Sequence, residues 1–482
     1  MTHIYNPEAQ KAVGDAHKVQ TTISPITGEP VVKRELPQSN DEIDHVLRAS
    51  HAAFRQWRQT PLNERKRIVQ QSVSNLVNRK DQLARELTEC MARPIRYTQS
   101  EILTYQDRAQ WLIDNCDKSL KDEPVDEGRP QGFERLIRRT PLGVCLLVGA
   151  WNFPYMIQVN ALIPALLAGN SVILKPSPQT PVVAERILES LLEAGLPKDV
   201  CQVMHLTPTQ MDYVVAHPLV SFVSFTGSVA NGQRVEKTAA SFPGPGFKHV
   251  GLELGGKDAA YVREDCDPAY AAENIVDGAM FNSGQSCCAV ERVYVHEKVY
   301  DAFVEECVKA GYVLDDPRKQ ETTLGPVISL RSAATIRSHI AEAVEQGAKA
   351  LIDEKQFSVA KEGTTYVAPQ VLINVNHSMK VMSQETFGPV MGIMKVSNDD
   401  EALKLINDSP YGLTASIWTQ DRQAFNKLVD HVETGTVFMN RCDYLDPALP
   451  WTGVKDSGRG ISLSRFGFDA VTRAKSVHVR LP

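Results

Sequence analysis

The sequence predicts an α/β protein with a doubly wound parallel sheet. From residue 143 onwards, short apolar runs alternate with longer segments of helical period. Runs that are apolar throughout are typical of parallel strands buried on both faces. Strands that alternate with helices imply right-handed crossovers, which cover the sheet with helices. A second region with the same alternation begins near Asp258, so we expect a second α/β domain.

The first hundred residues have the apolar spacing of helices. Either Ser39 or Asn40 can cap a helix whose apolar positions continue to Phe54. A second helical pattern follows Pro61, and a third is closed by Pro94, because proline cannot continue a helix. We therefore expect this region to be helical.

The first α/β region divides into successive strands and helices. Strands are expected at 144–148, 171–174, 200–205 and 221–225, and helices at 154–168, 181–193 and 209–216. Gly169 and Gly195 follow the first two helices, where a left-handed residue commonly ends a helix. Ligands bind such sheets at the carboxyl ends of the strands. Residues at or just after those ends should therefore lie together, namely Trp151, Asn152, Lys175, Gly227 and Ser228.

The second α/β region and two outlying segments complete the chain. A strand at 292–295 is followed by helices at 299–310 and 334–348. The segments 131–141 and 475–481 are polar and strand-like, and both lie outside the alternation of strands and helices. They predict a small separate β element.

Composition excludes several classes of protein. Hydrophobic residues make up 43% and charged residues 23% of the 482 residues, an ordinary globular balance. A net charge of −6 provides no electrostatic attraction to nucleic acid. No run of 18 apolar residues could span a membrane, and the polar first ten residues lack the apolar core of a signal peptide. We expect a cytoplasmic protein without nucleic-acid or membrane partners.

The cysteines and histidines do not form a metal or disulfide pattern. The nine cysteines are odd in number and include no C-x-x-C pair, which fits a reducing compartment. The twelve histidines form no H-E-x-x-H motif. We expect no metal.

Three residues together predict covalent chemistry on a carbonyl. Cys287 supplies a thiol nucleophile, Asn152 an amide that can donate to an oxyanion, and Glu253 a carboxylate that can activate water. Each signal is weak by itself, since a lone cysteine is more often a small buried hydrophobe. Their occurrence together, with further motifs in a fixed order, is specific.

In this order the motifs resemble those of the aldehyde dehydrogenase superfamily, over roughly residues 20 to 480. The motifs that carry the resemblance are Trp151-Asn152-Phe153-Pro154, Lys175-Pro176-Ser177, Phe225-Thr226-Gly227-Ser228, Glu253-Leu254-Gly255-Gly256-Lys257, Gly284-Gln285-Ser286-Cys287 and Glu385-Thr386-Phe387-Gly388-Pro389.

The resemblance implies three structural parts. Residues 1–122 and 142–253 would form a Rossmann-like dinucleotide-binding domain, and residues 254–455 a second α/β catalytic domain. Residues 123–141 and 456–482 would form a small β element that joins subunits into a homodimer or homotetramer. An unpaired edge strand favours such pairing.

The resemblance also implies roles for individual residues. Cys287 would be the nucleophile, Asn152 an oxyanion donor and Glu253 the base that hydrolyses a thioester. The cofactor, NAD or NADP, would be held by Trp151, Lys175, Ser177, Gly227, Ser228, Glu385 and Phe387. The start of the helix near Ser228 would bind the pyrophosphate through its positive dipole.

The sequence departs from the family pattern on the adenosine side. Family members often have Glu three residues after the ribose lysine, where this chain has Pro178. The stretch Leu206-Thr207-Pro208-Thr209 replaces a Gly-rich turn, and the insert at 241–246 is unusual. Without the Glu that repels a 2′-phosphate, NADP should be tolerated beside NAD.

The expected reaction is oxidation of an aldehyde to a carboxylic acid through a cysteine thiohemiacetal and thioester. By resemblance the substrate pocket would be lined by Phe153, Met156, Phe281, Ser286, Cys288, Leu445 and Trp451, which favours an apolar or aromatic aldehyde. Arg441 could pair with a carboxylate or be structural. A CoA-acylating enzyme, for which Glu253 is unnecessary, a semialdehyde dehydrogenase, and a thiol esterase, which needs a His partner, remain alternatives.

Overall fold

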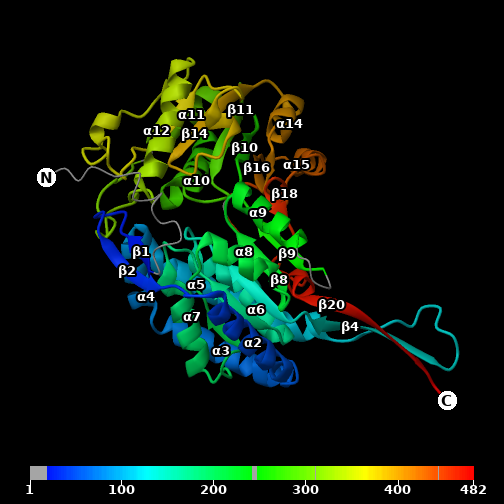
Figure 1. Cartoon of the computed structure of the whole chain (residues 1–482). Coiled ribbons are helices and arrows are strands. Elements are labelled where there is room, and N and C mark those ends of the chain that lie inside the picture. Colours follow the sequence, from blue (N-terminus) through cyan, green and yellow to red (C-terminus); the bar gives the residue numbers. More distant parts are fainter. Residues whose placement is uncertain (1–18, 242–246, 310, 443) are drawn as a thin grey trace.

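The computed structural model describes residues 19–482 apart from 242–246, 310 and 443, and it contains two large sheets (Figure 1). The first has the order β19-β9-β8-β5-β6-β7. Its strands are β5 (Val144–Val148), β6 (Ser171–Lys175), β7 (Cys201–Val203), β8 (Val220–Thr226), β9 (His249–Glu253) and β19 (Gly458–Arg459). Only β19 among these runs antiparallel to its neighbour. The expected parallel sheet is present, and its third strand is shorter than the predicted 200–205.

Helices cover this sheet as the alternation predicts. The crossover helices are α6 (Pro154–Ala168), α7 (Pro181–Glu193), α8 (Pro208–Ala216) and α9 (Val229–Ala240). The preceding helices are α2 (Asn40–Trp57), α3 (Leu62–Val77), α4 (Lys80–Met91) and α5 (Ile95–Leu120). Ser39 caps α2 by accepting from the Glu42 amide, and Gly169 ends α6 with a φ of 94°. Both local signals act as predicted.

The prediction that the first hundred residues are helical was wrong for residues 19–35. Strands β1 (Val19–Ile23) and β2 (Pro30–Glu35) form an antiparallel hairpin there. Its turn is closed by the Gly28 amide on the Ser24 carbonyl at 2.9 Å, and Gly28 has a φ of 75°. Both strands are largely exposed, so they carry little apolar pattern, and the missed signal was the Pro25 to Gly28 turn.

The second sheet has the order β12-β13-β14-β11-β10-β16-β17. Its strands are β10 (Asp258–Val262), β11 (Val290–His296), β12 (Lys349–Ala350), β13 (Gln370–Ile373), β14 (Val390–Val396), β16 (Thr414–Trp418) and β17 (Thr436–Met439). Its helices are α10 (Pro268–Met280), α11 (Tyr300–Lys309), α12 (Leu330–Glu345), α13 (Lys380–Ser383), α14 (Asp399–Asn407) and α15 (Arg422–Val429). The helix predicted at 334–348 begins earlier, because Ser329 caps it by accepting from the Ser332 amide.

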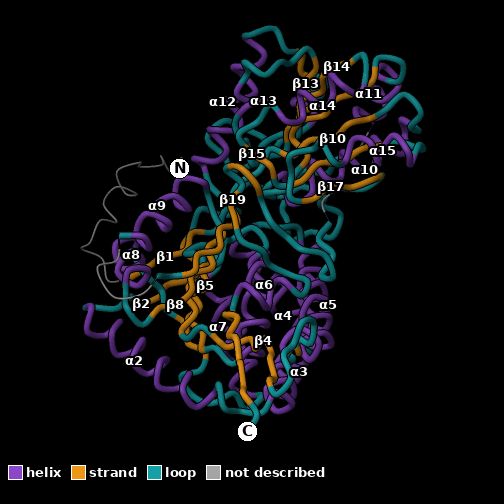
Figure 2. Tube along the Cα trace, turned by 90° about the vertical axis from the view of Figure 1, so that its right-hand side faces the viewer, coloured by secondary structure: helices purple, strands orange, loops and turns teal. Residues whose placement is uncertain are grey.

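The chain passes from the first sheet to the second through four residues, 254–257. It leaves the carboxyl end of β9 at Glu253 and enters the amino end of β10 at Asp258. Figure 2, in which strands are orange, shows the two sheets in separate halves with β19 and the short strand β15 (Tyr411–Gly412) between them. The carboxyl edge of the first sheet is thus joined to the amino edge of the second.

A three-stranded arm extends from the body of the molecule (Figure 1). Strand β20 (Thr472–Arg480) pairs antiparallel with all nine residues of β4 (Phe133–Pro141), and β3 (Glu123–Pro124) adds two residues on the other side of β4. Residues 456–471, which were also expected to belong to this β element, are not part of the arm. There β19 pairs with β9 while the short helix α16 (Phe466–Ala470) packs on α6. Within the described residues no helix is long and apolar enough to cross a membrane.

Candidate active site

The three residues predicted to carry the chemistry lie on the two joined edges. Asn152 follows β5 and Glu253 ends β9, so both lie at the carboxyl edge of the first sheet. Cys287 precedes β11, at the amino edge of the second sheet, after the short 3₁₀ turn η1 (Phe281–Gly284). Residues that are distant in sequence therefore meet where the sheets face one another.

Two contacts connect the Cys287 loop to the first sheet. The Asn152 side-chain amide donates to the Gln285 carbonyl at 3.3 Å. Gly256 lies so close to the loop that a Cβ there would be 2.0 Å from the Cys287 carbonyl oxygen. Such an approach requires glycine, which gives the second glycine after Glu253 a physical role.

Cys287 is one of the few accessible thiols. None of the nine cysteines is in a disulfide, and only Cys287 and Cys442 are not buried. Burial raises the pKa of Cys90, and equally that of Cys201, to about 12, which keeps such thiols protonated and unreactive. Neighbouring Cys288 is buried, with its sulfur 3.4 Å from the Ser286 hydroxyl.

Glu253 accepts two hydrogen bonds from neighbouring hydroxyls and lines a cavity. The hydroxyls of Ser462 and Thr226 donate to its two carboxylate oxygens. Burial raises the pKa of Glu253, while the Ser462 bond and the Arg108 charge oppose that rise. A cavity of about 240 Å³, lined in part by Glu253, Ser462 and Asn160, adjoins it. That volume has room for several waters beside Glu253, and neither Cys287 nor Asn152 is among the residues that line it.

A buried polar network that the sequence did not reveal positions Asn152. The Arg93 guanidinium donates to the Asn152 carbonyl, to the Glu101 carboxylate and, at 3.1 Å, to the Asn282 side-chain oxygen. Asn282 in turn donates to the carbonyls of Asn152 and Gln285 at 3.3 and 3.1 Å. Arg93 lies in the connection between α4 and α5 and Glu101 within α5, and nothing in their local sequence distinguishes them from other charged residues.

A second set of buried residues, Glu291 and Lys257, supports Phe387, which is predicted to hold the cofactor. The Glu291 carboxylate accepts from the amides of Thr386 and Phe387, both at 2.9 Å, and pairs with buried Lys257. Phe387 has a φ of 54°, and its ring meets that of Trp151 edge-on with centroids 5.6 Å apart. The available signal for Glu291 was the pair of adjacent charges, Glu291 and Arg292, at the start of the buried strand β11.

Glu385 lies next to the glycines that follow Glu253. Its carboxylate accepts from the Gly256 amide at 3.0 Å. A Cβ on Gly255 would lie 2.5 Å from the same carboxylate. Burial, with the charge of Glu291, raises the pKa of Glu385 to about 7.

The residues predicted for the phosphate and ribose end lie at the carboxyl edge of the first sheet. Helix α9 starts after Ser228 without a side-chain cap, and the Gly227 amide is held by the Glu253 carbonyl at 3.0 Å. Lys175 ends β6, and burial lowers its pKa to about 8. Ser177 is buried and accepts from the Gln179 amide at 3.2 Å.

The departures from the family pattern have local structural explanations. Pro178 is exposed, and its carbonyl accepts from the Thr22 hydroxyl of the missed hairpin at 2.7 Å. In the stretch that replaces the Gly-rich turn, Thr207 caps α8 through a reciprocal bond pair with Gln210. Of the insert at 241–246, residues 242–246 lie outside the described residues.

The predicted pocket residues fall into two groups. The rings of Phe153 and Phe281 stack with centroids 6.2 Å apart. A separate apolar cluster contains Cys287, Cys288, Leu413, Leu445, Trp451 and Leu463. Ser286 is buried, and the Met156 carbonyl accepts from Arg108 at 3.0 Å. Arg441 is exposed, with its guanidinium carbon 3.8 Å from the centre of the Tyr444 ring.

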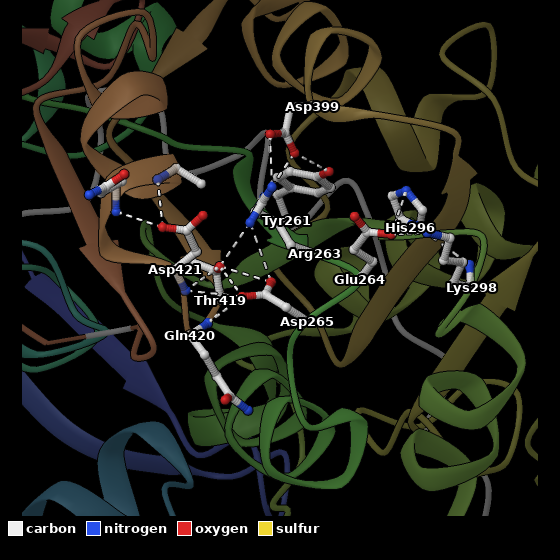
Figure 3. Close-up of polar contacts among 12 residues, drawn as sticks. Tyr261, Arg263, Glu264, Asp265, His296, Lys298, Asp399, Thr419, Gln420 and Asp421 are labelled. Atoms are coloured by element: carbon white, nitrogen blue, oxygen red, sulfur yellow. Dashed lines mark hydrogen bonds and ion pairs between the residues drawn. The ribbon is translucent and has the colours of Figure 1, made fainter.

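The opposite, carboxyl edge of the second sheet is filled by its own polar groups (Figure 3). Arg263 donates to the Asp399 carboxylate at 2.9 and 3.1 Å, and Tyr261 donates to it at 2.7 Å. The Asp265 carboxylate accepts from the Thr419 hydroxyl at 2.8 Å. The polar side chains at this edge are thus hydrogen-bonded to one another. Cys287 lies at the opposite, amino edge of the same sheet. Among the described residues no cluster of His, Cys, Asp and Glu could hold a metal ion.

Comparisons with known proteins identify the family to which this chain belongs. The model of the "Aldehyde dehydrogenase family" matches residues 13–477. A phenylacetaldehyde dehydrogenase of Pseudomonas fluorescens is 33% identical, over 95% of this chain and 92% of that protein. A succinic semialdehyde dehydrogenase from Streptococcus pyogenes, solved with NADP+, has a TM-score of 0.89 at 28% identity, over 96% of this chain and all of that one. A solved structure of PnpE with nicotinamide adenine dinucleotide has a TM-score of 0.90 at 28% identity, covering 96% and 94%. The chain belongs to the aldehyde dehydrogenase family.

Proposed function

We propose that this protein oxidises an aldehyde to a carboxylic acid with NAD or NADP, through a covalent intermediate on Cys287. The observation that carries the proposal is the junction of the two sheet edges. There an accessible thiol is connected to Asn152 through Gln285 and to the Glu253 strand through Gly256. A nucleophile, an oxyanion donor and a base are thus held on separate rigid elements, as acyl chemistry requires.

The proposed cycle assigns one task to each residue. The Cys287 thiolate adds to the carbonyl carbon, and the second N–H of the Asn152 amide donates to the resulting oxyanion. When bound, the nicotinamide accepts the hydride that the thiohemiacetal loses, which leaves a thioester on Cys287. Glu253 then takes a proton from water, the water attacks the thioester, and the acid leaves as the thiol is restored.

The residues present fit such a cofactor. The uncapped start of α9 presents backbone N–H groups to a pyrophosphate, while Lys175 lies at the neighbouring strand end for the ribose. Glu385 can accept from the nicotinamide ribose, and the paired Trp151 and Phe387 rings can form one wall beside the nicotinamide. Glu291, through the Thr386 and Phe387 amides, would keep that ring in place.

An aldehyde panel tests the function and its rivals. Aromatic rings at Phe153 and Phe281 support an apolar or aromatic substrate body, as in the similar phenylacetaldehyde dehydrogenase. Formation of NADH or NADPH with any aldehyde would support the proposal. A CoA-acylating enzyme would require CoA for turnover, and a thiol esterase would release acid from esters without a change in nicotinamide absorbance.

Pro178 should widen the choice of cofactor. Its ring neither accepts from the ribose hydroxyls nor repels a 2′-phosphate, whereas Lys175 can pair with phosphate. Pro178→Glu should shift kcat/KM toward NAD, since it adds an acceptor and like-charge repulsion. Pro178→Gln, which lacks the charge, is the matched control and should shift the ratio less. If the wild type already rejects NADP by more than about a thousandfold, roughly 4 kcal/mol, another residue enforces the choice.

The arm is proposed to join subunits into a homodimer or homotetramer. One edge of β20 has no strand partner among the described residues, and Ile137 and Val479 are 37% and 41% exposed along β4 and β20. Long edges of this kind favour pairing with another chain.

Deleting residues 473–482 should therefore convert the assembly to monomers or aggregates, because it removes nearly all of β20. Sedimentation at micromolar concentration measures this. A full-length protein that already sediments as a monomer would reject the role of the arm.

We also propose a cytoplasmic location. None of the nine cysteines is in a disulfide, and a reducing compartment keeps cysteines in the thiol form. A reactive Cys287 needs such conditions to avoid oxidation.

A further inference from the structure

We propose that Arg108 of α5 is a specificity-determining residue that binds a carboxylate on the substrate, so that the aldehyde is an aldehyde acid. This inference rests on the proposed function and narrows its substrate class. It goes beyond the expectation of an uncharged apolar aldehyde. The aromatic walls at Phe153 and Phe281 would still surround the body of the molecule between its two ends.

Arg108 is buried but incompletely satisfied. The residue is 5% exposed, and its Nε has no hydrogen-bond partner among the described residues. Its two hydrogen bonds both use Nη1, to the Met156 carbonyl at 3.0 Å and to the Asn160 side-chain oxygen at 3.2 Å. No carboxylate of the described chain lies within 4.0 Å of the guanidinium, unlike the other deeply buried arginine near the site, Arg93, which pairs with Glu101.

A buried guanidinium without an ion-pair partner is costly, because more distant carboxylates such as Glu253 compensate its desolvation less than a direct pair would. Buried charges are therefore normally paired, and an arginine presents a planar fork that matches a carboxylate. Arg65 of α3, 9% exposed, also has an unbonded Nε, so burial alone does not identify a binding site. Position distinguishes the two residues.

Arg108 lies among the reacting groups. Its partners Met156 and Asn160 are on α6, which begins two residues after Asn152, and Asn160 lines the cavity that also contains Glu253. The charge of Arg108 is within electrostatic reach of Glu253, Cys288, Glu101 and Tyr444, of which only Glu101 lies on α5 itself. The guanidinium is therefore close to both the base and the thiol loop.

Two other roles of Arg108 make different predictions. If Arg108 only anchored α6 through the Met156 carbonyl, its loss would harm every substrate equally. If it only stabilised the ionised form of Glu253, its loss would raise the pKa of that carboxyl and shift the pH profile for every substrate. Only a substrate-binding role predicts an effect that depends on the charge of the aldehyde.

The test compares matched aldehydes with the full-length enzyme and NAD or NADP. One pair is 4-oxobutanoate and butanal, and the other is 4-formylbenzoate and 4-methylbenzaldehyde. In at least one pair the wild type should prefer the charged member in kcat/KM. Arg108→Gln should lower kcat/KM for that member on the order of 10²-fold or more beyond any loss that it causes for the neutral partner, and Arg108→Lys should restore part of this difference.

Arg65→Gln is the matched control, since it removes a similarly buried arginine with an unbonded Nε away from the site, and it should leave the preference unchanged. Equal losses for both members, a shift confined to the pH profile, or a wild-type preference for the neutral members in both pairs would each overturn the proposal. Activity on no aldehyde would instead reject the proposed function.

A binding measurement, which needs no turnover, separates failure of the Arg108 proposal from failure of the proposed function. Succinate, which carries a second carboxylate, should bind the wild type more tightly than butyrate in calorimetry, and Arg108→Gln should remove that difference. Should Arg108→Gln not fold, the wild-type preference and the Arg108→Lys variant still decide the question. Equal binding of succinate and butyrate by the wild type would count against the Arg108 site whatever the enzyme's activity.

Discussion

Replacing Cys287 with alanine should abolish aldehyde oxidation, by at least about 10⁴-fold in kcat, while cofactor binding persists. The thiol forms the covalent bond from which the hydride departs, and no other group at the junction can replace a nucleophile. NAD(P)H formation measures the chemistry, and calorimetric titration with the oxidised cofactor measures binding. Loss of both would indicate a disturbed fold instead of a missing nucleophile.

The neighbouring thiol provides the control for this experiment. Cys288 is buried in the apolar cluster with Trp451 and Leu463, and it faces the Ser286 hydroxyl. Cys288→Ala should therefore have a mild effect, limited to packing. Activity that survives in Cys287→Ala would reject the covalent mechanism.

Glu253→Gln should slow turnover by roughly 10²–10⁴-fold, the usual contribution of a general base. Acylation of Cys287 does not need this carboxylate, so the thioester should accumulate. Mass spectrometry of the quenched enzyme should then show an acyl adduct on Cys287. Normal steady-state turnover without an adduct would exclude Glu253 as the hydrolytic base.

The pH dependence of the wild type provides an independent check. Glu253 acts as a base only when ionised, and burial raises its pKa above the ordinary value of 4.5. On acidification the deacylation rate should therefore begin to fall at a higher pH than it would if the base were an exposed glutamate. Glu253→Gln should lack this limb of the profile, which stopped-flow measurement of acid release can establish.

Local signals predicted most of the first sheet. The apolar runs at 144–148, 171–174 and 221–225 are strands, and Gly169 and Ser39 act as the helix signals that their positions suggest. These features depend on residues within one or two turns of one another, so a single stretch of sequence contains the information. The β1–β2 hairpin was missed because strands exposed on both faces carry little hydrophobic period.

The supporting residues of the site were beyond local reasoning. Arg93, which lies between α4 and α5, and Glu101 of α5 look like ordinary charged residues until the fold buries them beside Asn152. Glu291 differs only slightly, since Glu291 and Arg292 are adjacent charges within the buried strand β11. Arg441 drew attention as a possible carboxylate partner, yet it lies exposed against Tyr444, and Arg108 has the buried position instead.

The sequence by itself determined the alternation of strands and helices and the family resemblance, and it predicted Cys287, Glu253 and Asn152 as reactive groups. Only the tertiary structure decided that the carboxyl edge of one sheet meets the amino edge of the other, that Cys287 is among the few thiols left accessible, and that Arg108 is buried near Glu253 with an unbonded Nε. The physical reason is range. Helix period and capping act between near neighbours, whereas burial, pKa shifts and ion pairing depend on contacts between residues more than a hundred positions apart, such as Asn152 and Gln285.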